Sequence, residues 1–157
     1  MTFVIWRIAV EAPAYAANDL SGAGARITGG RWNSIGTSML YCSANIALAT
    51  LETLSFIRTG SLPFNRYLVR IEVPDPVWEL REVLTPLPGG WDAIPSGLTS
   101  RKAGDRWIAD SRSPLLAVPS VIVPDEYNIL INPSHPAVRR LVATTVRRWV
   151  YDARFFS

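Results

Sequence analysis

The sequence predicts a single α+β domain in which several short strands form sheets with two or three helices. Three observations favour this fold class. The chain has 157 residues, close to the usual size of one domain. Short apolar or alternating segments typical of strands recur along it, with a few segments of helical pattern between them. No internal repeat and no dividing linker is found, so we expect one domain over residues 1–157.

The strands are expected where β-branched and aromatic residues gather. One segment alternates so that Tyr67, Val69, Ile71 and Val73 share a face, which predicts a half-buried strand. The expected strands are Phe3–Val10, Met39–Cys42, Arg66–Val73, Leu115–Val123 broken at Pro119, Tyr127–Ile131 and Val146–Tyr151.

The helices are expected between these strands. Ser43 is a favourable N-cap for a helix that runs to about Arg58 and is closed by Gly60. Shorter helices are predicted over Ser100–Ser111 and around Val138–Val142. The glycine-rich segment Ser21–Gly36 is expected to be a loop. The Pro-, Gly- and Trp-rich segment Pro74–Gly97 is expected to be irregular, with little regular structure.

The composition excludes several classes of protein. Hydrophobic residues make up 48% and charged residues 18%, which excludes a disordered chain. No apolar run approaches the ~20 residues of a membrane span, and no basic segment precedes an apolar one at the start, so a cytoplasmic protein is expected. Cys42 and His135 are the only residues of their kinds, which excludes a disulfide framework and leaves little for a metal site. We therefore expect no metal.

The charge gives weak evidence for a polyanionic partner. The net charge is +3, and arginine supplies all cations except Lys102. The arginines are scattered, with doublets only at Arg139-Arg140 and Arg147-Arg148. A nucleic-acid binder usually has a clustered basic stripe, so we expect no direct nucleic-acid binding by this chain alone.

One acidic residue stands out in a long uncharged stretch. Glu52 is the only charged residue between Trp32 and Ile57. On the predicted helix its neighbours one turn away are Leu48 and Phe56, so the helix is expected to be apolar nearly all round and buried. A buried carboxylate is costly unless it is paired or used. Two explanations stay open, a structural ion pair with a distant arginine or a functional carboxylate.

A glycine pair precedes an arginine in Gly29–Arg31. Two glycines allow close approach of the backbone to a ligand, and a guanidinium binds anions through two parallel hydrogen bonds. The plain alternative is a tight turn with an exposed arginine. The dinucleotide fingerprint is excluded because Ile27 stands where its glycine belongs, and the Lys-Ser/Thr of a P-loop is absent. Tyr41 ends a strand just before the Glu52 helix, so it is either a core aromatic or part of one cleft with these residues.

Two polar residues lie in or beside apolar strands. Ser120 has no nucleophile elbow around it, and His135 lies in a proline-flanked turn, so a hydrolase triad is excluded. Ser120 is expected either as a polar contact in a pocket or as a partner of the backbone. Asn128 is expected as a strand-end cap or as a ligand contact.

Taken in order, these segments resemble the RES domain, the toxin half of RES–Xre toxin–antitoxin pairs, which is named for an Arg, a Glu and a Ser. The match covers nearly the whole chain and is poorest over Pro74–Gly97. The matching segments are Trp6–Ala9, Leu20–Gly22, Gly29–Asn33, Tyr41 with the Glu52 helix, Gly104–Trp107, Val118–Ser120, Val123-Pro124, Tyr127-Asn128, Asn132-Pro133, His135-Pro136 and Tyr151–Arg154.

The resemblance implies a compact fold related to ADP-ribosyltransferases and an enzyme that uses NAD as its substrate, without a metal or further cofactor. It implies Glu52 as the residue that stabilises positive charge on the ribose when nicotinamide leaves. Arg31, and with it Arg7, would bind the pyrophosphate. Tyr41 would offer its ring to the nicotinamide cation, and Ser120 would orient the substrate. Asn128 completes the expected substrate site.

The resemblance ranks the activities. Degradation of NAD by hydrolysis or phosphorolysis comes first, in a toxin that a cognate Xre-family antitoxin neutralises. A protein mono-ADP-ribosyltransferase with the same site is the first alternative. A non-enzymatic or nucleolytic RNA-binding module is an alternative of another class and predicts steep salt dependence. An inactive family member that only binds a partner is the last, and retention of all motif residues argues against it. The acceptor, the oligomeric state and the role of Pro74–Gly97 stay open.

Overall fold

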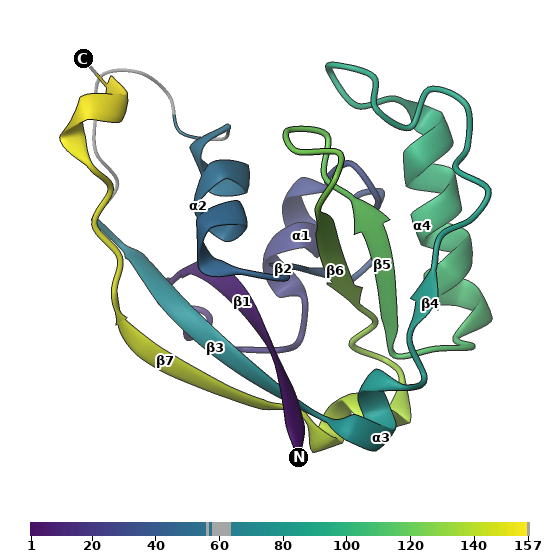
Figure 1. Ribbon diagram of the computed structural model, residues 1–157, viewed down its shortest axis with the longest axis horizontal. Coiled ribbons are helices and arrows are strands. Elements are labelled where there is room, and N and C mark those ends of the chain that lie inside the picture. The colour runs from purple at the N-terminus through teal and green to yellow at the C-terminus, as the bar shows by residue number, and fades with distance from the viewer. Residues whose placement is uncertain (56, 58–63, 157) are drawn as a thin grey trace.

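The computed structural model describes residues 1–55, 57 and 64–156 (Figure 1). Its strands form one seven-stranded sheet in the order β4-β5-β6-β2-β1-β3-β7. Neighbouring strands are antiparallel except β4 and β5, which are parallel. The α+β fold class is confirmed. The elements are β1 (Thr2–Val10), α1 (Ala23–Thr28), β2 (Leu40–Ser43), α2 (Ile46–Leu54), β3 (Arg66–Pro74), α3 (Asp75–Trp78), β4 (Glu82–Val83), α4 (Leu98–Asp110), β5 (Leu115–Pro119), β6 (Tyr127–Ile131), the 3₁₀ turn η1 (Pro136–Arg140), β7 (Val142–Arg148) and the 3₁₀ turn η2 (Ala153–Phe156).

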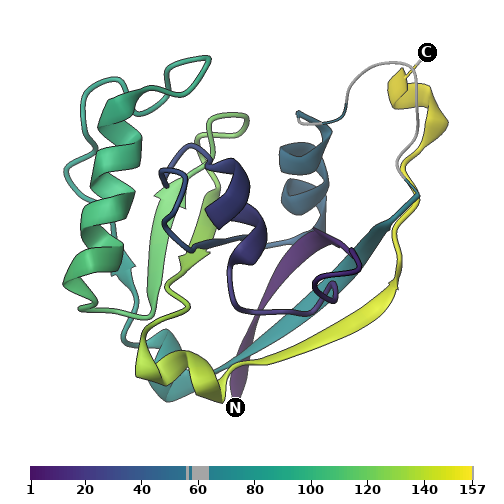
Figure 2. The ribbon, with the colours of Figure 1, turned by 180° about the vertical axis from the view of Figure 1, so that it is seen from behind.

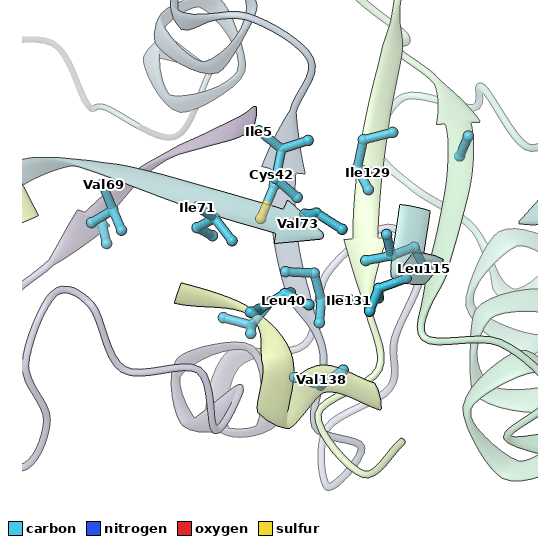
Figure 3. Close-up of a cluster of buried hydrophobic side chains, with 14 of the residues drawn as sticks. Ile5, Leu40, Cys42, Val69, Ile71, Val73, Leu115, Ile129, Ile131 and Val138 are labelled. Carbon is cyan, nitrogen blue, oxygen red and sulfur yellow. The ribbon is translucent and has the colours of Figure 1, made fainter. Parts of the chain in front are cut away.

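One face of the sheet carries the largest buried apolar cluster (Figure 3). Side chains from the central strands meet there because alternate residues of a strand point to the same face. Val69, Ile71 and Val73 of β3 are fully buried in it and Tyr67 packs against it, which confirms the predicted alternation. η1 covers this face through Val138. Each buried aliphatic side chain contributes about 1.5–3 kcal/mol, so this layer stabilises the fold.

The opposite face carries two smaller apolar clusters rather than one. In the first, Trp107 of α4 and Trp32 pack against β5 and β6. In the second, Ala49 of α2 packs against Ile8 and Leu68 of β1 and β3. Figures 1 and 2 show α1 between α2 and α4 in both views. The two helices therefore cover separate parts of one sheet face, and the strands between them present the polar side chains described below.

Helix α2 begins later than predicted. Ser43 is the last residue of β2, and Asn45 is the N-cap, with its Oδ1 accepting the Leu48 amide at 2.8 Å. Ser and Asn are about equally favourable caps, so the local pattern does not distinguish them. The predicted helix end at Arg58 and Gly60 lies outside the described residues.

Three other predictions about elements need correction. The glycine-rich segment is not wholly irregular, because α1 begins after Gly22, which has φ 74°. Pro74–Gly97, by contrast, has little regular structure as predicted, with the short elements α3 and β4 near its start. The helix predicted around Val138–Val142 is the 3₁₀ turn η1, and the last strand starts at Val142 rather than Val146. This strand lies at the edge of the sheet and is mostly exposed, so it lacks the apolar alternation that marks a half-buried strand.

Because the thiol of Cys42 is buried, we expect the free energy of unfolding to depend on pH in the alkaline range. Burial raises its pKa from 9.0 to about 12, against a smaller opposite effect of Arg7. Since the folded state holds this proton more tightly, the stabilisation is complete below about pH 9 and is lost as the pH rises toward 12. We expect urea denaturation to give a free energy of unfolding that falls over this range. In Cys42→Ala the free energy of unfolding should fall less steeply with pH. The difference in slope is at most that of one titrating proton, about 1.4 kcal/mol per pH unit. Equal slopes in the two proteins would contradict this.

Candidate active site

The carboxylate of Glu52 is held by two polar side chains from the sheet. Its Oε1 accepts the Ser120 hydroxyl at 2.5 Å and the Asn128 Nδ2 at 2.9 Å. Its Oε2 has no hydrogen-bond partner among the described residues. The buried side-chain atoms that lack a partner there are Nε of Arg7 and Nε1 of Trp149, so Oε2 keeps contact with solvent. One oxygen is thus fixed in position and the other can reach a ligand.

The surroundings of Glu52 differ from the apolar, sealed environment that the sequence predicts. Only Leu48 and Ala49 of α2 are buried, and Glu52 is partly buried. Its partners are a hydroxyl and an amide. Among the described residues no arginine pairs with it. The alternative of a structural ion pair therefore has no support in the part of the chain that the structure describes.

The hydroxyl of Ser120 is fully committed to its neighbours. The residue follows β5 and is completely buried. Its Oγ accepts the amides of Ile122 and Val123 at 3.1 and 3.0 Å. A hydroxyl has two lone pairs and one proton, so that proton is left for Glu52. Ser120 thus closes the turn after β5 and orients the carboxylate, and it has no further bond to offer.

Asn128 is oriented by Ser43, which from the sequence is expected only as a helix cap. Ser43 pairs with Asn128 across β2 and β6, and its hydroxyl donates to Asn128 Oδ1 at 2.7 Å. The amide oxygen is then engaged, and the amide nitrogen points to Glu52 at 2.9 Å. Ser43 is buried. Its alternation with Tyr41 on β2 is the sequence signal that could have placed it on this sheet face.

The loop that carries Arg31 is built around Tyr41. The phenol donates to Asn33 Oδ1 at 2.6 Å and accepts the Trp32 amide at 2.9 Å. Burial is the largest effect on the phenol and raises its pKa well above 10, so the group stays neutral. A Cβ added to Gly30 would lie 2.7 Å from the Tyr41 hydroxyl, so only glycine allows this approach. The hydroxyl of Tyr41 is therefore used within the protein, and its ring is what remains for a ligand.

The guanidinium of Arg31 uses part of its hydrogen-bonding capacity within the protein, on the Trp-rich segment. Its Nη1 donates to the carbonyls of Trp91 and Ala93 at 2.9 and 2.8 Å. The ring of Trp91 stacks on Trp32, with centroids 6.4 Å apart. Nε and Nη2 of Arg31 have no hydrogen-bond partner among the described residues and are not buried. Two donor nitrogens therefore remain for an anion, as the predicted role requires.

Helix α4 holds the same loop from the other side. Asp105 accepts the Ser34 amide at 2.9 Å and the Ser34 hydroxyl at 2.6 Å. One residue earlier, Gly104 lies against the backbone of Trp32, where a Cβ would be 1.7 Å from the Trp32 carbonyl oxygen. Arg31 thus projects from a loop that is fixed on both sides.

The structure brings most predicted residues to one sheet face, with one exception. Tyr41 and Ser43 alternate on β2 and pair with Leu130 and Asn128, so Tyr41 points to the sheet face that carries Ser43 and Asn128, the partner of Glu52. Among the described residues no hydrogen bond joins Glu52 to Arg31 or Tyr41.

Arg7 occupies a different environment. Its β1 neighbours Ile5 and Ala9 belong to the large cluster on the opposite face. Its Nη1 donates to the Tyr41 carbonyl at 3.1 Å. Its side chain is therefore placed with that cluster, and among the described residues no hydrogen bond joins it to Glu52.

Removing the Tyr41 hydroxyl is expected to destabilise the loop. Tyr41→Phe leaves Asn33 Oδ1 and the Trp32 amide without this partner, which should lower the free energy of unfolding by about 1–3 kcal/mol. Urea denaturation measures the change. Tyr127→Phe is the matched control, since Tyr127 is 45% exposed. If the two variants are equally stable, the phenol does not organise this loop.

Two negative findings apply to the described residues. No group of three or more His, Cys, Asp or Glu side chains is placed there to hold a metal ion. No helix there has the length and apolar character needed to cross a membrane.

Comparison with known proteins gives a consistent result. The model of the RES domain matches residues 4–153. A protein of Sphingobium sp. (strain YBL2), named "Prs ADP-ribosylating toxin", is 54% identical over 156 residues, which cover 98% of this chain and 97% of that protein. A "Toxin Res" of Pseudomonas putida (strain KT2440) is 36% identical and covers 98% of this chain and 99% of its own.

A solved structure shares the fold. A chain of the M. tuberculosis MbcT–MbcA toxin–antitoxin complex superposes with a TM-score of 0.58, covering 94% of this chain and 85% of that one. The sequence identity is 14%, so this likeness concerns the fold alone.

Proposed function

The chain belongs to the RES domain family, and on that premise we propose that it is a toxin enzyme that breaks the nicotinamide–ribose bond of NAD. The observation that carries the proposal is the Glu52 carboxylate, fixed through Oε1 and accessible at Oε2. Breaking this bond sends its electron pair to nicotinamide and leaves positive charge on the ribose. A preorganised carboxylate stabilises such charge.

The neighbouring residues support the binding of a dinucleotide. The free Nε and Nη2 of Arg31 suit the pyrophosphate. The ring of Tyr41 suits the nicotinamide cation. Ser120 acts on the substrate through Glu52, since its hydroxyl has no free bond. Asn128 positions the Glu52 carboxylate with one N–H of its amide, and the second N–H is left for the substrate. Arg7 does not bind the substrate in this proposal. It donates a hydrogen bond to the Tyr41 carbonyl and so affects the site only by positioning β2.

The acceptor that we favour is a protein side chain. After nicotinamide leaves, a nucleophile forms the new bond to the ribose carbon and gives up its proton. The name of the 54% identical relative describes ADP-ribosylation of Prs, and this favours protein transfer over the hydrolysis or phosphorolysis that the sequence analysis ranks first. Hydrolysis and phosphorolysis remain the second candidate because they use the same bond cleavage at Glu52.

One experiment separates these outcomes. The purified protein is incubated with NAD labelled in the adenylate part, with or without phosphate and with or without a cell lysate, and nicotinamide release is followed. Label on protein supports transfer, free ADP-ribose supports hydrolysis, and a phosphate-dependent product supports phosphorolysis. If no nicotinamide is released under any of these conditions, the proposed function is wrong.

A cognate antitoxin of the Xre family is proposed as the partner. The solved neighbour is a toxin–antitoxin complex, and relatives are named as toxins. Expression of the toxin alone should arrest growth, whereas coexpression with the antitoxin should restore it. Growth that is unaffected by the toxin alone would contradict this proposal.

A further inference from the structure

A groove of about 480 Å³ lies between α4 and residues 82–88, where β4 forms the edge of the sheet beside α4 (Figure 1). Its floor is apolar and includes Trp107 and Leu116, with Val83 and Leu84 at the rim. None of the candidate active-site residues lines it. The groove is therefore separate from the candidate active site.

One half of the groove carries two basic side chains. Lys102 and Arg106 line it from α4, one turn apart, and both are exposed. Neither makes an ion pair with any described residue. Like charges at this spacing repel each other on a helix, and Asp110 stands one turn after Arg106 on its far side.

The other end of the groove is closer to neutral. Arg112 lies 3.8 Å from Glu82. The second oxygen of Glu82 accepts the Ser113 hydroxyl at 2.8 Å. Asp110 lines this end as well. An anionic ligand is therefore favoured next to Lys102 and Arg106 and not along the whole groove.

The edge strand offers backbone groups beside the basic pair. The amide of Leu84 points inward and donates to the Ala117 carbonyl at 3.0 Å. Successive residues of a strand direct their amides to opposite sides, so Val83 directs its amide and carbonyl outward. β4 is the last strand of the sheet on this side. An extended chain can pair with such an edge.

We infer that this groove binds an extended acidic segment of a partner protein, with two acidic side chains spaced i and i+2. The rise along α4 from Lys102 to Arg106 is about 6 Å. Same-face residues of an extended segment are about 6.6 Å apart, so each carboxylate meets one cation. The segment's backbone pairs with Val83, and its other side chains meet the apolar floor.

The position of the groove connects it to the active-site loop. The segment that forms the outer wall of the groove continues from β4 to Trp91. The carbonyl of Trp91 accepts a hydrogen bond from Arg31. A bound segment therefore lies beside the part of the protein that holds Arg31.

The test uses fluorescein-labelled peptides and the full-length protein. The probe alternates threonine and glutamate. Its controls are a peptide alternating threonine and lysine, and a peptide of the same composition with all glutamates in one block. We expect fluorescence anisotropy to show binding of the alternating acidic peptide, with weaker binding of the block peptide and none of the basic one. Binding should weaken as salt is raised.

Charge reversal locates the site. Lys102→Glu/Arg106→Glu should weaken binding by about tenfold or more, whereas Arg139→Glu/Arg140→Glu on η1, which changes the net charge equally, should have little effect. Circular dichroism checks that both variants fold, and hydrogen exchange of residues 82–88 should slow when the peptide binds. Three outcomes would overturn the inference. The two double variants could lose binding equally, or the alternating and block acidic peptides could bind equally well. Inorganic phosphate, at the same total charge as the peptide, could also displace the peptide. Because no NAD is present, failure here leaves the proposed function unaffected.

Discussion

Replacement of Glu52 by glutamine is expected to lower the rate of nicotinamide release by roughly 10²–10³-fold while the protein stays folded. The negative charge that stabilises the developing cation is lost. The fold is kept because the glutamine carbonyl has the shape of the carboxylate and can accept the same bonds from Ser120 and Asn128. A time course of nicotinamide release with NAD in excess measures the effect.

The control for this variant is the same Glu→Gln substitution at a position outside the candidate active site. Glu79 follows α3 and is exposed, so Glu79→Gln should retain full turnover. Urea denaturation should give all three proteins similar free energies of unfolding. If Glu52→Gln turns over at the rate of the parent protein, the role assigned to this carboxylate is wrong and the proposed mechanism fails with it.

The sequence identifies those parts of the site that carry their own local signal. Glu52 is visible because it is the only charge in a long uncharged stretch. The β3 face is visible because Val69, Ile71 and Val73 alternate, and burial on one face makes that period obligatory. These predictions succeed because the cause lies within a few residues of the effect.

The contacts that tune the site could not be predicted because they join distant positions. Glu52 is 68 residues from Ser120 and 76 from Asn128, so the helix pattern alone indicated an apolar environment that the structure does not have. Ser34 and Asp105 are 71 residues apart. Arg7 illustrates a different difficulty, since the face to which its side chain points depends on the strand partners of β1 and not on its own sequence.

A single methyl group on Gly104 is expected to destabilise the protein by about 3 kcal/mol. On an exposed helix, Gly→Ala would stabilise by about 0.5–1 kcal/mol because alanine restricts the unfolded chain. Here the added Cβ would lie 1.7 Å from the Trp32 carbonyl oxygen and 2.7 Å from its carbon. Both atoms belong to the backbone, so α4 and the Arg31 loop must separate.

The separation of α4 from the Arg31 loop should also affect activity, because this loop is held at several points. It is held by Asp105 at Ser34 and by Tyr41 at Asn33, so a displacement at Trp32 moves Arg31. We expect Gly104→Ala to raise the KM for NAD in addition to lowering the urea midpoint. Gly89→Ala is the matched control, since nothing lies within 4 Å of its added Cβ. Equal or greater stability of Gly104→Ala than of Gly89→Ala would show that α4 does not clamp the loop. Lower stability with an unchanged KM would show instead that the clamp serves folding, and that Arg31 takes its position from Trp91 and Ala93.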